Sequence, residues 1–274
     1  MHWILTVPAD FSLKELLQRS RWLLLPPFSP CRIPECLERV ERLSSGQTTA
    51  MNITQTPAGL QIQVELHLNA AEIEELSQKT WRMLRLGETF TPFLERARED
   101  ADLQAAIRQG VRFLRGADFF EDLLKALLLA EMPLNNAAQR LAQLVDRLGD
   151  PLPANPTRHA LPTAGQVLAE EEVTQRILGV ERGTTILHAA RYYQHHDQQL
   201  ERLLVTVPPL PDLLTQLNQI PGMTNSARAY LLLALGRYEC VPATPDLATR
   251  REVARFDQWQ PWGGLVYWLE HAPQ

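Results

Sequence analysis

The part of the sequence best suited to chemistry lies between residues 217 and 251. A polar turn, Pro221–Asn225, separates two segments with helical periodicity, and the second of these segments stops at Gly236. The tripeptide Thr244-Pro245-Asp246 then opens another helix, with proline in its first turn and an acid beside it. Backbone N–H groups that follow such a turn can bind a phosphate, and Asp246 would face the same ligand.

This arrangement of hairpin, apolar helix and acid resembles the helix-hairpin-helix DNA glycosylases. That superfamily includes the bacterial 3-methyladenine DNA glycosylase of the second type, 8-oxoguanine glycosylase and endonuclease III. The segment Ile220–Met223 is similar to the family's hairpin, and Pro242–Arg251 resembles the acid-bearing segment of the alkyl-base branch. Further similar motifs occur in the family's order at Arg21–Phe28, Gly110–Leu123 and Trp259–Trp268, so the resemblance covers nearly the whole chain.

The predicted fold is mainly α, and α+β overall. The resemblance and the patterning together imply a small antiparallel α+β domain over residues 1–85, followed by a helical helix-hairpin-helix glycosylase domain over residues 86–274. Strands are expected at 3–7, 36–43, 48–54 and 60–68, with a helix at 13–19 that Ser12 caps. Helices are expected at 70–86, 91–98, 100–109, 118–130, 134–148, 163–168, 170–178, 183–194, 210–219, 226–235, 246–256 and 261–270.

Asp246 is the predicted catalytic residue. The resemblance implies cleavage of a C–N bond through an oxocarbenium-like transition state, which a nearby carboxylate would stabilise. Without the resemblance, Asp246 reads as a helix-start acid that the helix dipole stabilises by about 0.3–1 kcal/mol. Members with lyase activity carry a lysine on the second hairpin helix, and counting places Ser226 there, or Asn225 if the turn shifts by one. Neither is an amine nucleophile, so the implied activity is a monofunctional glycosylase that removes alkylated purines of the 3-methyladenine type from duplex DNA.

The resemblance also implies roles for further residues. One departure concerns Thr224, which falls where the family has its second hairpin glycine, a position of positive φ that threonine tolerates poorly. The expected DNA-binding hairpin comprises Pro221, Gly222, Met223, Thr224, Asn225 and Ser226. The other expected residues are Met132 and Leu134 as the duplex wedge, Arg237, Arg250 and Arg251 as phosphate contacts, and Trp22, Phe113, Phe119, Phe120 and Tyr230 as base-pocket candidates.

The bulk composition limits the possible partners. No apolar run is long enough to cross a membrane, and no cysteine or histidine pattern indicates a metal site. His195-His196-Asp197 reads as a solvated turn. Cys31 and Cys36 could pair, but reduced thiols in a cytoplasmic, nucleoid-associated protein are the simpler expectation. We expect a monomer with damaged double-stranded DNA as its partner and no cofactor, apart from a monovalent cation that the resemblance would place at the hairpin.

Two alternatives stay open at the level of sequence. The net charge of −5 is unusual for a DNA-binding protein, although a basic face can coexist with acidic surroundings. The chain could therefore be a catalytically inactive DNA-binding or damage-sensing relative. It could also be a divergent interaction protein on the same fold.

Overall fold

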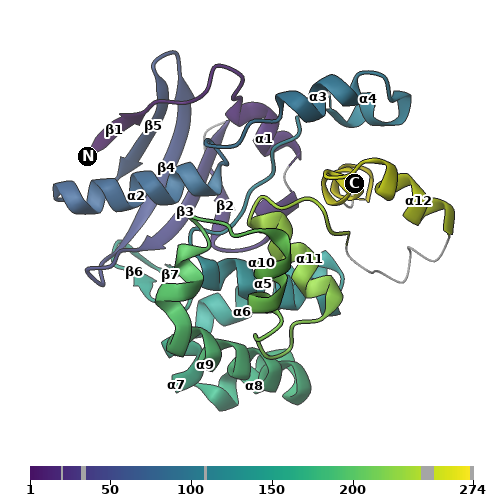
Figure 1. The fold of residues 1–274 in the computed structure, drawn as a ribbon. Coiled ribbons are helices and arrows are strands. Elements are labelled where there is room, and N and C mark those ends of the chain that lie inside the picture. The colour runs from purple at the N-terminus through teal and green to yellow at the C-terminus, as the bar shows by residue number, and fades with distance from the viewer. Residues whose placement is uncertain (20, 32–34, 108–109, 242–249, 272–274) are drawn as a thin grey trace.

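The chain combines an N-terminal sheet with a larger group of helices (Figure 1). The structure is a computed structural model that describes residues 1–19, 21–31, 35–107, 110–241 and 250–271. Its mixture of elements confirms the expected mainly α, α+β class.

The N-terminal sheet is antiparallel and five-stranded. Its strands are β1 (His2–Leu5), β2 (Phe28–Pro30), β3 (Cys36–Arg42), β4 (Thr48–Thr56) and β5 (Gly59–Val64). Their order across the sheet is β1-β5-β4-β3-β2, and β2 is the one strand of the five that had not been predicted. The predicted alternation in β5 is confirmed, because Leu60, Ile62 and Val64 are at most 2% exposed and point into the core.

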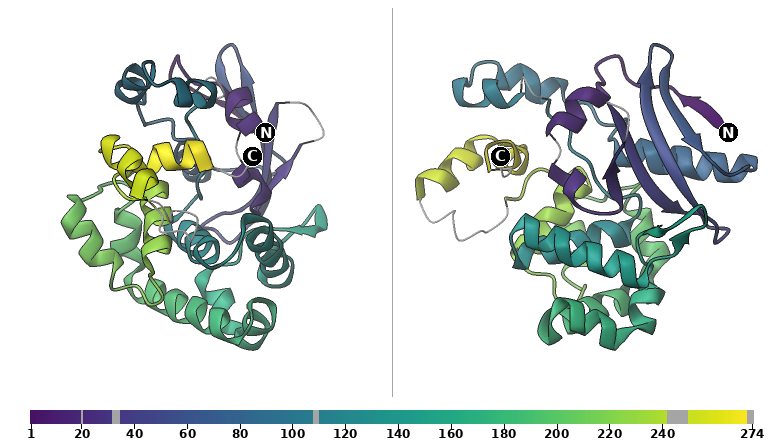
Figure 2. Two further views of the ribbon diagram at one scale, coloured as in Figure 1. Left: turned by 90° about the vertical axis from the view of Figure 1, so that its right-hand side faces the viewer. Right: turned by 180° about the vertical axis from the view of Figure 1, so that it is seen from behind.

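Helical segments accompany this sheet, namely α1 (Leu13–Arg19), the 3₁₀ turn η1 (Arg21–Leu24) and α2 (Ala70–Met83). Helix α2 lies across one face of the sheet (Figures 1 and 2). Its start is fixed by a reciprocal cap, in which Asn69 accepts the N–H of Glu72 and the Glu72 carboxylate accepts the N–H of Asn69. The predicted cap of α1 is also present, since the Ser12 hydroxyl accepts the N–H of Glu15 at 3.2 Å.

The remaining helices form the second part of the chain. They are α3 (Thr91–Ala97), α4 (Ala101–Ile107), α5 (Phe119–Glu131), α6 (Leu134–Leu148), α7 (Ala164–Ala169), α8 (Glu171–Leu178), α9 (Val180–Arg202), α10 (Leu210–Leu217), α11 (Asn225–Ala234), α12 (Arg250–Gln258) and α13 (Gly263–His271). Helix α5 is central, because every residue from Phe119 to Leu128 is buried and α6, α9 and α11 pack around it. A helix enclosed in this way can display no wide polar face to water.

A short hairpin interrupts the helices between α6 and α7. Strands β6 (Pro151–Leu152) and β7 (Asn155–His159) pair there, between the helices expected at 134–148 and 163–168, where no strand had been predicted. The hairpin contacts both α6 and β4, so it connects the helical part of the chain to the sheet.

Helix α9 is longer than predicted. The expected solvated turn at His195-His196-Asp197 is wrong, because the helix continues through it with a local departure from helical geometry at His196. The His196 ring stacks on the ring of Tyr192, with centroids 4.1 Å apart. The Nδ1 atom of His196 is hydrogen-bonded to the carbonyl of Tyr192, and Nδ1 of His195 is hydrogen-bonded to the carbonyl of Arg191. Within the described ranges no group of three or more possible metal ligands occurs.

Two expectations about the whole chain can be compared with the structure. Cys31 and Cys36 form a disulfide, so the expectation of reduced thiols is wrong for this pair, while Cys240 is a free, half-buried thiol. In the described part of the chain, no helix has both the length and the apolar character needed to cross a bilayer.

The main hydrophobic core runs through both parts of the chain. It includes Ile62 of the sheet, Leu123 of α5 and Leu231 of α11. Leu84 and Leu86, which flank the predicted domain boundary between residues 85 and 86, both belong to it. The sheet and the central helices therefore share one packed interior.

Candidate functional site

The predicted hairpin is present between α10 and α11. The amide of Met223 donates to the carbonyl of Ile220 at 3.2 Å, and Gly222 has a φ of +79°. Glycine is required here for a second reason, because a Cβ at this position would lie 2.2 Å from Thr185 Cγ2 on α9. The turn is thus fixed both by its own hydrogen bonds and by close packing on α9.

Thr224 does not adopt the positive φ that its alignment with a glycine suggested. Its φ is −75° and its ψ is 168°, and it is the N-cap of α11. The Thr224 hydroxyl accepts the N–H of Ala227 at 3.1 Å, which is the usual role of threonine at this position. The expected conflict was wrong because the helix begins one residue earlier than predicted, at Asn225.

Arg228 holds the two ends of the hairpin together. Its guanidinium donates to Asn218 Oδ1 at 2.5 Å and to Asn225 Oδ1 at 2.6 Å. Gly222, Thr224 and Asn225 are exposed, so the turn before α11 faces solvent.

Helix α11 stops at its other end as predicted. Gly236 has a φ of +78°, its N–H donates to the Leu233 carbonyl, and the amide of Arg237 donates to the Leu232 carbonyl.

The predicted wedge turn lies beside the hairpin. Met132 directly follows the last residue of α5, and Leu134 is the first residue of α6. Both side chains are half-buried against the core, whereas the neighbouring Glu131 and Pro133 are exposed. A cavity of about 170 Å³ joins this turn to the hairpin. Its wall includes Glu131, Glu181, Arg182, Thr185, Gly222 and Thr224.

The aromatic candidates fall into two groups of ring contacts. Trp22 and Phe113 contact each other and Trp268, with centroids 5.2–6.5 Å apart, and Tyr230 packs against both hydrophobic clusters of this region. Phe119 and Phe120 instead contact Tyr193 of α9. Trp22 Nε1 is buried with no hydrogen-bond partner in the described part of the structure.

The charged candidates are only partly described. Arg237 donates to Glu239 at 2.6 Å and to the Pro208 carbonyl at 2.8 Å, so its charge is already compensated inside the protein. Asp246 lies outside the described residues. Arg250 and Arg251 begin α12, but the positions of their side chains are not described.

None of the three lysines of the chain is on α11, and each is held in an ion pair. Ser226, where counting from the hairpin places the amine of lyase-competent relatives, is on the first turn of α11 and is half-buried, and the alternative Asn225 is exposed. The sequence contains three lysines, of which Lys14 pairs with Glu35, Lys79 with Glu41 and Lys125 with Glu121. Each ammonium group is therefore bound to a carboxylate.

A buried ionic network around α5 was not predicted. Glu121, 1% exposed, pairs with Arg39 of β3 at 3.0 Å and with Lys125 at 2.5 Å. Next to it, Asp122 pairs with Arg82 of α2. The sequence signal was ambiguous, because Glu121 and Lys125 are four residues apart and such pairs are usually exposed on a helix surface.

The network shifts the ionisation of its members. Burial alone would raise the pKa of Glu121, but the charges of Arg39 and Lys125 outweigh it and hold that pKa below its ordinary range. Burial lowers the pKa of Lys125. Burial, together with the charges of Glu121 and Glu201, raises the pKa of Asp118 to about 7.

Comparison with known proteins identifies the fold. No protein-family model and no curated protein matches the sequence. Among solved structures, the 3-methyladenine DNA glycosylase of Archaeoglobus fulgidus has a TM-score of 0.73 at 20% identity, over 98% of this chain and 97% of that one. MBOgg1 in complex with a low-affinity DNA ligand has a TM-score of 0.66 at 18% identity, over 100% and 96% of the two chains.

An 8-oxoguanine glycosylase/lyase is also similar. The apo enzyme of Clostridium acetobutylicum has a TM-score of 0.63 at 14% identity, over 85% of this chain and 87% of that one. The likeness to these structures extends over both the sheet and the helices, and the hairpin before α11 is where the sequence placed it. The chain has the fold of the helix-hairpin-helix DNA glycosylases.

Proposed function

We propose that this protein is a DNA repair glycosylase that removes alkylated purines from duplex DNA and leaves the strand uncut. The observation that carries the proposal is the exposed, capped hairpin before α11, set in a fold that matches a 3-methyladenine DNA glycosylase over nearly its full length. The comparisons include glycosylases for two kinds of lesion. The choice of alkylated purines rests on the segment Pro242–Arg251, which resembles that of the alkyl-base branch, and on the lack of an amine at Ser226 or Asn225.

The hairpin is the proposed anchor for a backbone phosphate. The start of α11 supplies backbone N–H groups and the positive end of a helix dipole, and both favour an anion. The carbonyl oxygens of Ile220 and Gly222 each accept one hydrogen bond within the turn. Each keeps a second lone pair, so the turn also fits a monovalent cation that would bridge it to the phosphate.

Two sets of apolar side chains would handle the target base. Met132 or Leu134 would enter the duplex and unstack the base step, since the turn that carries them lies beside the hairpin. The flipped base would stack on aromatic faces near Trp22, Phe113 and Tyr230, which suits an electron-poor alkylated ring. Phe119 and Phe120 contact a different partner, Tyr193, and serve this role less well.

Asp246 is the proposed catalytic acid, with Arg250 and Arg251 beside it as phosphate contacts. Its carboxylate would stabilise the developing positive charge on the sugar and orient the attacking water. Ser226 cannot form a Schiff base with the sugar, so no strand-cleaving step follows. Borohydride should accordingly trap no covalent complex between the protein and an abasic duplex.

The proposal is tested by base release from duplex oligonucleotides that carry alkylated purines. The parent protein, Asp246→Asn and Asp257→Asn are incubated with each duplex, and alkali then reveals the abasic sites. Asp257 is an exposed aspartate of α12 and provides a matched control. We expect cleavage by the parent and by Asp257→Asn, and little cleavage by Asp246→Asn.

Other outcomes identify the alternatives. Equal activity of the parent and Asp246→Asn would place the catalytic acid elsewhere. Binding of damaged duplex without base release would indicate a damage-sensing protein. Absence of any salt-dependent affinity for DNA would contradict the proposal altogether, because phosphate contacts impose a steep dependence on salt.

A further inference from the structure

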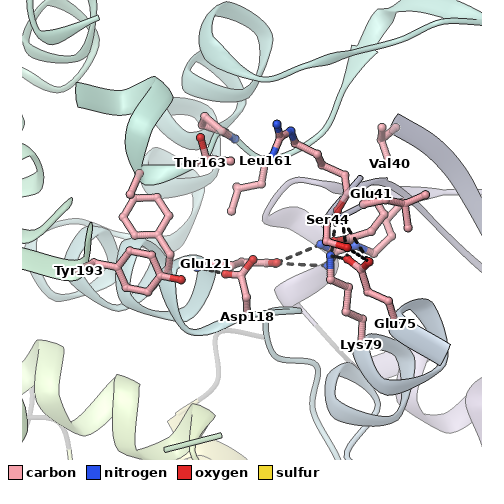
Figure 3. Close-up of a pocket in the computed structure, with 16 residues that line it drawn as sticks. Val40, Glu41, Ser44, Glu75, Lys79, Asp118, Glu121, Leu161, Thr163 and Tyr193 are labelled. Atoms are coloured by element: carbon pink, nitrogen blue, oxygen red, sulfur yellow. Dashed lines mark hydrogen bonds and ion pairs between the residues drawn. The ribbon is translucent and has the colours of Figure 1, made fainter. Parts of the chain in front are cut away.

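Many cations of this protein are already bound to carboxylates. In the cavity between the sheet and the helices, Lys79 pairs with Glu41 at 2.8 Å (Figure 3), and Arg39 pairs with Glu121 at 3.0 Å. Near the hairpin, Arg237 is held by a carboxylate as well. The net charge of the protein is −5, so a duplex must be attracted by the cations that stay free.

Arg182 of α9 is such a cation, and it lies beside the hairpin. Its side chain is exposed and lines the cavity of about 170 Å³ that joins the hairpin to the wedge turn. Among the described residues its guanidinium has no ion-pair or hydrogen-bond partner. The planar group therefore offers its N–H donors to a partner from outside, and its geometry fits the oxygens of a phosphate.

The start of α9 is held in place on two sides. Toward α8, a Cβ at Gly183 would lie 2.6 Å from Gln175 Cα, so the two helices can approach this closely only at a glycine. Toward the hairpin, Thr185 packs against Gly222, three residues after Arg182. The backbone that carries Arg182 is therefore fixed relative to the hairpin, and only its side chain has to be ordered on binding.

The wall of the cavity contains charges of both signs. Arg182 is the only cation among the described residues that line it. Glu131 and Glu181 line it too, and both are exposed and in no ion pair within the described ranges. Their charges would repel a phosphate, and the other lining side chains are neutral, so the guanidinium is the group of this wall that attracts a DNA backbone.

We infer that Arg182 contacts a phosphate of the DNA strand that passes between the hairpin and the wedge turn. The inference rests on the proposed function, in which the duplex covers both of these turns. Such a contact would orient the protein on the duplex and carry no preference for sequence, because it reaches no base edge.

The experiment measures binding of the full-length protein to a labelled duplex by fluorescence anisotropy, at NaCl concentrations from about 50 to about 200 mM. The duplex contains one stable abasic-site analogue, so no base has to be released. Arg182→Gln removes the charge, and Arg182→Lys keeps it. Arg176→Gln is the matched control, because Arg176 of α8 is exposed, has no partner among the described residues and does not line the cavity. Glu181→Gln removes a neighbouring charge of the opposite sign.

Arg182→Gln should lower the slope of the logarithm of the binding constant against the logarithm of the salt concentration by about 0.9, the value for one phosphate. A change of this size corresponds to about fivefold weaker binding at about 150 mM salt, for affinities that become equal near about 1 M salt. Arg182→Lys should keep the slope of the parent, and Arg176→Gln should bind as the parent does. Glu181→Gln should bind more tightly, because Arg182 then attracts the phosphate with less opposition.

Three results would overturn the inference. They are an unchanged slope in Arg182→Gln, an equal loss of slope in Arg176→Gln, and weaker binding by Glu181→Gln, which would show that this wall meets the donor groups of base edges instead of a phosphate. An unchanged slope in Arg182→Gln, with a parent that binds the duplex, would refute the inference alone. A parent without salt-dependent affinity for DNA would refute the proposed function as well.

Discussion

Replacing Gly222 by alanine should destabilise the protein through two separable effects. An L-residue in the left-handed region at φ +79° costs roughly 1–2 kcal/mol. The new Cβ would also lie 2.2 Å from Thr185 Cγ2, and overpacking of this kind costs about 1–3 kcal/mol. The expected loss in the free energy of unfolding is therefore roughly 2–5 kcal/mol, the sum of the two effects.

Two further substitutions separate these effects. Gly46 has a φ of +87° and only an ordinary contact, at 3.9 Å, so Gly46→Ala should show the conformational cost alone. Thr185→Ser removes the clashing methyl group and keeps the hydroxyl that donates to the Glu181 carbonyl at 3.2 Å. In the Thr185→Ser background, Gly222→Ala should therefore lose about 1–3 kcal/mol less than it does in the parent.

Urea unfolding followed by circular dichroism gives the free energy of each single and double variant. If Gly222→Ala loses no more stability than Gly46→Ala, the hairpin does not pack on α9 as the structure shows. If Thr185→Ser restores nothing, the clash is not with this methyl group. Gly222→Ala should also weaken binding to duplex DNA, because it displaces the hairpin, whereas Gly46→Ala should leave that binding unchanged.

Three other predictions concern charges. Asp118→Asn should stabilise the protein by roughly 2–4 kcal/mol at pH 9 and hardly at pH 4. The pKa of Asp118 is raised on folding, so the parent loses stability as pH rises from about 4, the ordinary pKa of an aspartate, to about 7, and loses no more above it. Urea unfolding at both pH values would contradict this if the difference between parent and variant is constant. Glu121→Gln should lose about 3–5 kcal/mol in the same assay, since Lys125 stays buried without its ion-pair partner and Arg39 keeps only Glu41. A neutral outcome would show that Lys125 finds another partner. Glu239→Gln should release Arg237 from its ion pair and raise the affinity for duplex DNA. The slope of the logarithm of the binding constant against the logarithm of the salt concentration should become steeper by about 1. An unchanged slope would exclude Arg237 as a phosphate contact.

The helices around the hairpin could be predicted closely from the sequence. Helix α6 was predicted at its observed bounds, and α5 and α11 to within one residue, because Pro133, Gly149 and Gly236 mark their ends. The hairpin position followed from the same kind of signal at Gly222. Local backbone preferences decide these features, and local preferences are what a sequence displays directly.

Features that depend on tertiary contacts were missed. The β6–β7 hairpin contains several prolines and reads as a loop, and its pairing becomes favourable only where it contacts β4 and α6. Helix α9 continues through polar residues at His196 because that ring stacks on Tyr192. The burial of Glu121 could not be foreseen, since its main partner, Arg39, is eighty-two positions away.

The division of the aromatic candidates also required the fold. Trp22 and Phe113 come from separate segments and meet Trp268 of α13, whereas Phe119 and Phe120 face α9. Adjacent residues on a helix point in different directions, and only the packing of α5 tells which neighbour each one meets. Asp246 stays a prediction, as do the roles given to Arg250 and Arg251.

The ionic network around α5 limits how far this chain can be divided. Arg39 and Arg82 lie on the sheet side of the predicted boundary at residue 85, and they neutralise Glu121 and Asp122 on the helical side. A helical fragment cut at that boundary would retain both carboxylates in an apolar interior, but it would lose the counterion of Asp122 and one of the two counterions of Glu121. The helical part therefore depends on the arginines of the sheet side to balance its buried charges. The sheet and the helices should fold only together, and neither should be transferable to another protein as a separate domain.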